Sequence, residues 1–335
     1  MSSQNKKLKI ILTAIIVVSF FALYVPHKNT VVKSVDNLPL WKQTINFSKT
    51  KYSNETGNPT GEYLVPNYIH FIKFNAQKIT YVHMICILAA FKNQKPEKIF
   101  FHRNFNTSFE GKYWDVLKNT KGFLDIVVFN YIPIPEEFFG QRLDPNSAFT
   151  VYHASDFARV LMLKKYGGII LDSDTYIINN LNQFRTFEMT LNWDENQFLG
   201  TQLFIAHKDA RFLQLYLETY RHYRPDLWYY NAGELPTTSI LYKNPELIHR
   251  VKVLFGADTK FIGDIFQTKW SDWRNFFAVH LLVNHQYLLQ NVTEKATFPV
   301  NFNEQNIVNY PVTFREMAYD VYDIAGVDWP KETKD

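Results

Sequence analysis

Residues 155–178 of the 335-residue chain read SDFARVLMLKKYGGIILDSDTYII, and they predict a helix, a tight turn and a strand in succession. The segment Ser155–Tyr166 is apolar on most of its sides, which predicts a largely buried helix with Ser155 as its N-cap. The pair Gly167-Gly168 then ends the helix and turns the chain tightly. We expect Ile169–Leu171 to form a buried strand that runs directly into Asp172-Ser173-Asp174, the D-x-D motif.

Two carboxylates end this predicted strand. At positions i and i+2 of an extended chain, Asp172 and Asp174 project to the same side, with Cα atoms roughly 6–7 Å apart. Like charges repel, and their desolvation is costly unless a cation compensates for it. A divalent ion such as Mn²⁺ or Mg²⁺ has this effect and keeps open positions for substrate phosphates. The sequence therefore predicts a metal site, and the alternative is two solvated acids at a strand end.

Strand and helix candidates alternate along the rest of the chain. Apolar runs predict strands at Asn67–Phe74, Lys98–His102 and Leu124–Phe129. Helices are predicted at Tyr81–Phe91 and around Trp114–Leu117. This alternation predicts an α/β domain with a mainly parallel central sheet, whose ligand site lies at the carboxyl ends of the strands.

The composition excludes several classes of protein. Hydrophobic residues make up 46% and charged residues 20% of the chain, which excludes a disordered chain, a collagen and a many-span membrane protein. Lys+Arg 36 against Asp+Glu 32 leaves a net charge of +4, too weak and dispersed for nucleic-acid binding. The single cysteine, Cys86, excludes an intrachain disulfide and a cysteine metal cage. We expect its thiol to be buried.

The N-terminus predicts a membrane anchor. Residues 10–26 carry no charge, and as a helix they span roughly 26 Å, close to the ~27 Å of an early secretory membrane. Lysines without acids precede them, so the positive-inside rule places a tail over residues 1–9 in the cytosol and the rest in the lumen. We expect a transmembrane signal-anchor, and the alternative is a cleaved signal peptide.

A linker is expected between this anchor and the domain. Residues 27–65 are rich in Lys, Asn, Thr and Ser without a sustained apolar period, which predicts a stem and leaves residues 66–335 as the catalytic domain. A lumenal location is also favoured by four N-x-S/T sequons, at Asn46, Asn54, Asn106 and Asn291.

The central stretch resembles a known signature. The DXD-containing sugar transferases of the Gly_transf_sug family usually read S-D-x-x-R, a hydrophobic stretch and G-G-x-Y-x-D-x-D. This chain matches that pattern, with Ile170 in place of the usual Tyr, at Ser155, Asp156, Arg159, Gly167, Gly168, Asp172 and Asp174. Residues 65–74 are similar to the family's opening strand. The segments at 270–273 and 277–280 resemble blocks of its α-1,4-galactosyltransferase and α-1,4-N-acetylglucosaminyltransferase group.

The resemblance implies a GT-A-type nucleotide-sugar-binding domain, a nucleotide-sugar donor, Mn²⁺ (with Mg²⁺ possible) and retention of the anomeric configuration. Asp172 would contact the donor and assist the metal, while Asp174 would bind the metal directly. His280 is implied as a third metal ligand, and the alternative is a structural histidine. Glu234 would face the anomeric carbon as a nucleophile or ion stabiliser, or it is a loop acid.

Three further residues are implied as donor-binding. Asp156 and Arg159 would hold sugar hydroxyls and a phosphate or sugar oxygen, and the alternative is an ion pair on the helix surface. His70 would lie near the nucleotide, and the alternative is a core histidine.

Together these features predict a retaining glycosyltransferase, a single-pass type II protein of the Golgi membrane with a lumenal catalytic domain. It would transfer galactose or N-acetylglucosamine from a UDP donor to a glycan or glycolipid acceptor. Two alternatives stay open: a GDP-mannose-dependent α-mannosyltransferase, and a catalytically weak secretory sugar-binding protein that keeps the fold. The sequence makes no prediction of the oligomeric state.

Overall fold

The computed structural model describes residues 38–283, 285, 301–310 and 312–326. The predicted cytosolic tail, the anchor at residues 10–26 and the sequon at Asn291 lie outside these residues. Within the described ranges, the helices are too short or too polar to cross a membrane. From Pro39 onward, the described residues belong to one compact unit.

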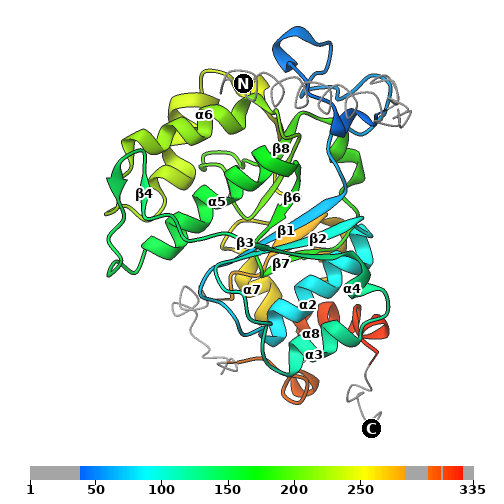
Figure 1. Ribbon diagram of the computed structural model, residues 1–335. Coiled ribbons are helices and arrows are strands. Elements are labelled where there is room, and N and C mark those ends of the chain that lie inside the picture. The colour runs from blue at the N-terminus through cyan, green and yellow to red at the C-terminus, as the bar shows by residue number, and fades with distance from the viewer. Residues whose placement is uncertain (1–37, 284, 286–300, 311, 327–335) are drawn as a thin grey trace, which may run out of the picture. The chain divides into compact units, whose positions relative to one another are not determined.

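A seven-stranded sheet forms the centre of this unit (Figure 1). The strand order is β10-β8-β9-β6-β1-β2-β3; β9 runs antiparallel to both of its neighbours, and the other adjacent pairs are parallel. The prediction of a mainly parallel sheet in an α/β domain is therefore confirmed. Its strands are β1 (Tyr68–Lys73), β2 (Lys98–Arg103), β3 (Val127–Tyr131), β6 (Gly168–Leu171), β8 (Met189–Asn192), β9 (Leu203–Ala206) and β10 (His249–Val251).

Two small antiparallel pairs accompany the main sheet. One joins β7 (Thr175–Ile177) to β11 (Ala278–His280), and the other joins β4 (Glu137–Phe138) to β5 (Gln141–Arg142). The α-helices of the described residues are α2 (Tyr81–Ala89), α3 (Lys112–Asn119), α4 (Phe123–Ile126), α5 (Thr150–Tyr166), α6 (Arg211–Thr219), α7 (Phe261–Phe266) and α8 (Thr313–Tyr319).

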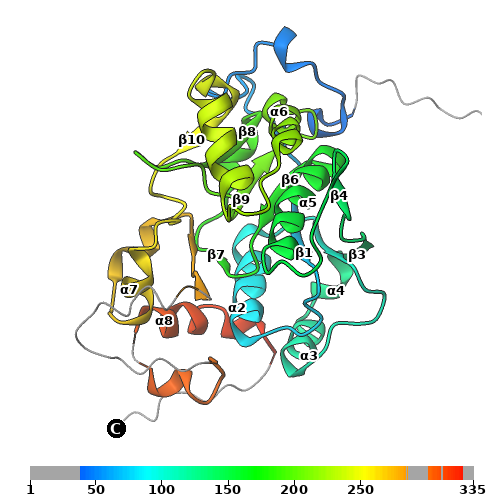
Figure 2. The same ribbon diagram turned by 90° about the vertical axis from the view of Figure 1, so that its left-hand side faces the viewer.

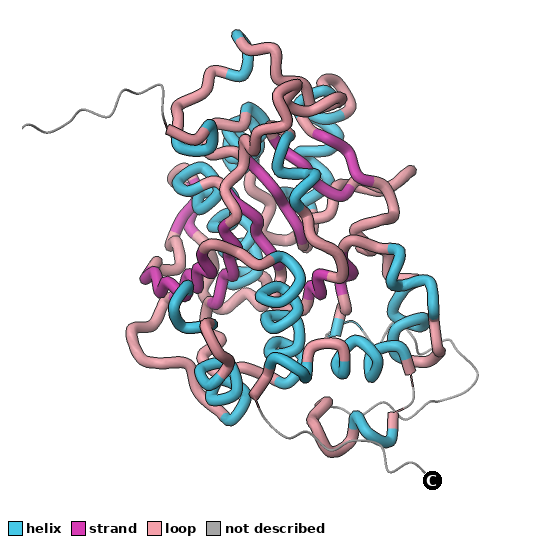
Figure 3. The backbone as a smooth tube through the Cα atoms, turned by 90° about the vertical axis from the view of Figure 1, so that its right-hand side faces the viewer, coloured by secondary structure: helices cyan, strands magenta, loops and turns pink. Residues whose placement is uncertain are grey.

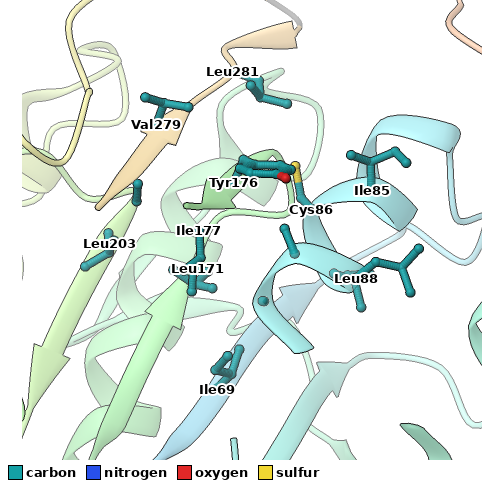
Figure 4. Packing of buried hydrophobic residues seen from close by; sticks show 14 of the residues in the cluster. Ile69, Ile85, Cys86, Leu88, Leu171, Tyr176, Ile177, Leu203, Val279 and Leu281 are labelled. Carbon is teal, nitrogen blue, oxygen red and sulfur yellow. The ribbon is translucent and has the colours of Figure 1, made fainter. Parts of the chain in front are cut away.

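Hydrophobic cores cover both faces of the sheet. Strand β6 contributes Ile169 and Leu171 to one core and Ile170 to the other, because side chains alternate along a strand. Helices α5 and α6 lie over the second core, and α2, α3, α4, α7 and α8 lie over the first (Figures 1 and 2). Figure 4 shows the first core, where the buried thiol of Cys86 packs near Tyr176. Burial on both faces explains why β6 and β9 carry no polar side chain.

Two predicted element boundaries are wrong. Helix α5 begins at Thr150 rather than Ser155, and the Ser155 hydroxyl donates to the carbonyl of Val151 (2.8 Å) inside the helix, so Ser155 is not its N-cap. The run Leu124–Phe129 was predicted as one strand, but its first residues form α4 and β3 begins only at Val127. A short apolar run fits a buried helical turn as well as a strand.

The compact unit begins ahead of the predicted boundary at residue 66. Ile45 and Phe47 are only 8% and 4% exposed, and Leu64 and Val65 are fully buried. The backbone N–H of Ile45 donates to Asp209 Oδ2 (2.9 Å). The described part of the predicted stem thus packs against the domain. This segment is mostly loop with short 3₁₀ turns, which carry no regular apolar period (Figure 3).

The described sequons differ in accessibility. Asn46 and Asn106 are exposed. Asn54 is buried, where its Nδ2 donates to the carbonyl of Glu246 (3.1 Å) and its Oδ1 accepts from the N–H of Met189 (3.2 Å). A glycan on Asn54 is incompatible with these contacts, so the fold removes Asn54 from the predicted acceptors.

Candidate metal and donor site

The D-x-D motif lies in a turn between β6 and β7. The N–H of Asp172 donates to the carbonyl of Gln202 (2.9 Å), and the N–H of Thr175 donates back to the carbonyl of Asp172 (3.0 Å). The extended geometry predicted for residues 172–174 is therefore wrong. Asp172 and Asp174 converge because the chain turns after β6, at the carboxyl end of a central strand.

Strand β11 brings a histidine to this turn. It pairs antiparallel with β7, with His280 opposite Thr175. His280 Nε2 lies 3.2 Å from Asp174 Oδ1 and 3.8 Å from Asp172 Oδ2. One potential ligand atom from each of Asp172, Asp174 and His280 lies within 4.8 Å of the others. Two carboxylates and an imidazole fit a divalent transition metal, and we call these three residues the metal-ligand cluster.

The protonation states of this cluster depend on each other. Burial raises the pKa of Asp174, but the charge and hydrogen bond of His280 outweigh burial and hold that pKa below its usual range. Burial lowers the pKa of His280, but the charge and hydrogen bond of Asp174 reverse the effect and raise it. Without metal, the histidine proton thus stabilises the carboxylates. A bound cation would take over that role.

Arg159 of α5 contacts Asp172, the first acid of the D-x-D motif. Its guanidinium donates to Asp172 Oδ1 and to the carbonyl of Thr201 (2.9 Å), and its Nη1 lies 3.1 Å from Asp156 Oδ1. Burial raises the pKa of Asp156 to about 6, although the charge of Arg159 opposes the shift. The structure brings Asp156 and Arg159 to the motif. The contacts of the Arg159 guanidinium described here are to protein oxygens.

The cluster opens into a cavity of about 640 Å³. The predicted residues Asp156, Arg159, Asp172, Asp174 and His280 all line it. Three aromatic side chains, which we call the aromatic rim, also line it and are partly exposed: Tyr152 (53%), Phe198 (40%) and Trp228 (41%). The Tyr152 and Trp228 rings meet edge to face, with centroids 4.9 Å apart. The cavity therefore combines a charged site with aromatic surface.

Sequence analysis did not single out four polar residues of the cavity wall. Lys73 at the end of β1 and His83 of α2 lie beside the D-x-D turn. Asn192 Oδ1 and Gln202 Nε2 are buried and have no hydrogen-bond partner among the described residues. Such groups are costly unless a ligand or water satisfies them. The one sequence signal was Lys73 itself, a lysine inside the apolar run NYIHFIKF.

The structure places His70 in the core rather than the cavity wall. Its Nε2 lies 2.9 Å from the carbonyl of Gly167, and its Nδ1 lies 2.9 Å from His102 Nε2. His102 Nδ1 in turn accepts from Asn130 Nδ2 (2.9 Å). One set of tautomers satisfies this chain, with both imidazole protons on Nε2. Burial lowers the pKa of His70 to about 3, so it is a neutral structural residue.

Glu234 is not among the described residues that line the cavity of Asp172 and Asp174. It ends the helical turn Tyr230–Glu234, and in this part of the chain the cavity is lined by Trp228 and Tyr229. A role for Glu234 at the anomeric carbon therefore has no support in the geometry of the described residues.

Comparisons with known proteins connect this site to one class of chemistry. Residues 91–191 match the sequence model of the family described as "Glycosyltransferase sugar-binding region containing DXD motif". The chain is 22% identical over 183 residues to Glucan organizing enzyme 1 of Cryptococcus neoformans var. grubii serotype A, across 49% of this chain and 46% of that protein. It therefore spans less than half the length of this curated relative.

Two solved structures show a remote likeness. An active-site mutant of LgtC has a TM-score of 0.42 and 14% identity, covering 79% of this chain and 98% of that chain. The apo form of the glycosyltransferase GlyE of Streptococcus pneumoniae TIGR4 has a TM-score of 0.41 and 9% identity, covering 79% of this chain and 61% of that chain. The match at residues 91–191, which includes the D-x-D motif, supports a glycosyltransferase sugar-binding region.

Proposed function

We propose that the chain carrying this sugar-binding region is a metal-dependent glycosyltransferase with a GT-A-type domain and a nucleotide-sugar donor. The observation that carries the proposal is the convergence of Asp172, Asp174 and His280 on the wall of one cavity. A divalent ion held there would neutralise the negative charge that develops on the diphosphate as the sugar–phosphate bond breaks. The imidazole favours Mn²⁺ over Mg²⁺, which prefers oxygen ligands.

The surrounding residues support distinct roles in this reaction. Arg159 holds Asp172 in position, while the N–H of Val283 donates to Asp174 Oδ2 (3.2 Å). The unsatisfied amide groups of Asn192 and Gln202 are suited to sugar hydroxyls, which both donate and accept hydrogen bonds. We propose retention without a protein nucleophile, in which the leaving phosphate accepts the proton of the acceptor hydroxyl.

The sequence resemblance supports a choice of donor. The segments at 270–273 and 277–280 are similar to blocks of the α-1,4 group, which favours UDP-galactose or UDP-N-acetylglucosamine. GDP-mannose is the alternative donor. For the acceptor, the aromatic rim supports a glycan or glycolipid, because apolar ring faces can stack against sugar rings.

We further propose a lumenal Golgi location with residues 10–26 as a type II anchor. The lysines before this segment and the exposed sequons at Asn46 and Asn106 support it. Immunofluorescence with a Golgi marker, together with glycopeptide mapping, tests the proposal. A chain that distributes through the cytosol without glycans would contradict it.

The central experiment is a donor screen. The protein is incubated with UDP- and GDP-sugars in the presence of Mn²⁺ or EDTA, and donor hydrolysis is followed. We expect hydrolysis of one donor class that EDTA abolishes. Asp174→Asn should remove this activity without unfolding the protein, because it takes one charged ligand from the cluster. The exposed Asp115→Asn is the matched control and should retain activity.

Two outcomes would contradict the proposed function. Full donor hydrolysis by Asp174→Asn, or undiminished activity in EDTA, would remove the D-x-D motif from the metal site. A wild-type protein that binds nucleotide-sugars but hydrolyses none would instead favour the catalytically weak sugar-binding protein.

A further inference from the structure

The two positively charged side chains described in the cavity wall, Arg159 and Lys73, differ in their contacts. Arg159 is paired with two carboxylates, those of Asp156 and Asp172, and also donates to the carbonyl of Thr201. Lys73 is the other lysine or arginine among the described residues that line the cavity. The positive charge that this wall can offer to a ligand therefore depends on the contacts of Lys73.

Lys73 is buried, and the hydrogen-bond partners of its ammonium are neutral side chains. The residue is 2% exposed, and its Nζ lies 3.2 Å from Ser173 Oγ and 3.4 Å from His83 Nδ1. Burial lowers the pKa of His83 to about 3, so this imidazole is neutral at pH 7. In the described part of the chain, no carboxylate forms an ion pair with Lys73.

A buried ammonium without a paired carboxylate is energetically costly. Burial lowers the pKa of Lys73 to about 8, against the opposing charge of Asp174, so the group stays mostly protonated at pH 7. An ammonium has three N–H donors. Ser173 and His83 can accept two of them, which leaves the third for a ligand in the cavity. Such a group would bind an anion most strongly.

We propose that Lys73 binds a phosphate oxygen of the donor's diphosphate, next to the metal-ligand cluster. Ser173, the middle residue of the D-x-D motif, holds the ammonium in position through its hydroxyl. The inference rests on the proposed function and deepens it, since it assigns a protein cation from β1 to the anionic part of the donor. Lysine suits this role as a compact point charge.

A purely structural Lys73 leads to different expectations. If the ammonium only balances nearby Asp174, its removal changes stability and leaves nucleotide affinity unaltered at saturating Mn²⁺. If it binds diphosphate, its removal lowers the affinity for nucleoside diphosphates but not for nucleosides. In both cases a nearby ammonium repels a divalent cation, so its loss should leave Mn²⁺ affinity unchanged or increase it.

The test uses isothermal titration calorimetry on the full chain with Lys73→Met, which is uncharged and of similar length. The probes are Mn²⁺ alone, then UDP, GDP, uridine and guanosine at saturating Mn²⁺. We expect the affinity for the better-bound nucleoside diphosphate to fall at least tenfold. Affinity for its nucleoside and for Mn²⁺ should not fall. Lys98→Met, at the exposed start of β2, removes the same charge away from the cavity and should bind like wild type.

The outcomes separate this inference from the proposed function. If wild type binds a nucleoside diphosphate and Lys73→Met binds it equally well, Lys73 is not a diphosphate ligand but the proposed function stands. If wild type binds neither UDP nor GDP with Mn²⁺, the proposed function fails, and the Lys73 assignment fails with it. Should Lys73→Met not fold, Lys73→Gln keeps a donor for Ser173 without the charge and replaces it in the same titrations.

Discussion

At the scale of single residues, the contact between Gly168 and His70 explains two motifs of the sequence together. Gly168 has φ +121°, and a Cβ atom there would lie 2.6 Å from His70 Nε2 and 2.7 Å from the carbonyl of Tyr68. The imidazole needs this space to reach the carbonyl of Gly167. The histidine of β1 and the glycine pair before the D-x-D motif are therefore in direct contact.

Gly168→Ala should therefore destabilise the protein strongly. Besides an unfavourable φ, the new methyl group meets His70 and backbone on a central strand, and we expect a loss of at least about 3 kcal/mol in unfolding free energy. Gly122→Ala is the matched control, since Gly122 has φ +79° and nothing within 4 Å of its Cβ position. It should lose about 1 kcal/mol. Denaturant unfolding measures both, and equal losses would contradict the role given to His70.

At the scale of elements, the pairing of β7 with β11 assembles the metal-ligand cluster. The D-x-D turn leads directly into β7, and the antiparallel register places His280 beside it. The N–H of Leu281 donates to the carbonyl of Asp174 (2.9 Å), which ties the two segments together beyond the strands. A histidine about a hundred residues away in sequence thereby becomes a candidate ligand.

His280→Ala should weaken the metal site without abolishing it. Asp172 and Asp174 remain, so the Mn²⁺ concentration for half-maximal activity should rise at least tenfold, which corresponds to about 1.4 kcal/mol. His249→Ala serves as the control, because His249 of β10 donates through Nδ1 to the carbonyl of Asn54 (3.0 Å) and does not line the cavity of the metal-ligand cluster. It should lower the melting temperature and leave the Mn²⁺ requirement unaltered. An unchanged Mn²⁺ midpoint in His280→Ala would make His280 a structural residue.

At the scale of the whole molecule, residues 39–65 belong to the folded domain. Ile45, Phe47 and Leu64 join the core that also contains β1 and α2. Their burial is not visible in the sequence, because short turns and loops with scattered apolar residues and no regular period resemble a linker. This segment therefore extends the minimal folded unit toward the N-terminus.

A comparison of two shortened chains tests this extension. Removal of residues 1–37 should leave a soluble, cooperatively folding protein. Removal of residues 1–65 also removes four buried apolar side chains, those of Ile45, Phe47, Leu64 and Val65. Each contributes ~1.5–3 kcal/mol, which is a large share of a typical domain stability of ~5–15 kcal/mol. We expect the shorter chain to aggregate or to melt at a clearly lower temperature. Equal melting temperatures by calorimetry would show that residues 38–65 are a stem after all.

The features predicted correctly from sequence are those encoded in contiguous residues. The apolar run after Gly167-Gly168 was enough to predict strand β6, and the two acids that follow it belong to the metal-ligand cluster described above. The alternation of apolar segments was enough for a mainly parallel sheet. Hydrophobic period and glycine conformation act over a few residues, so a local pattern reveals them.

The features missed depend on contacts between distant parts of the chain. Lys73 and Ser173 are 100 positions apart, and only the pairing of β1 with β6 makes them neighbours. The same holds for the chain of contacts from Gly167 through His70 to His102, which makes His70 structural rather than donor-binding. Whether a charged or polar side chain is buried, and what satisfies it, depends on the packing of the whole domain, and no local stretch of residues contains that information.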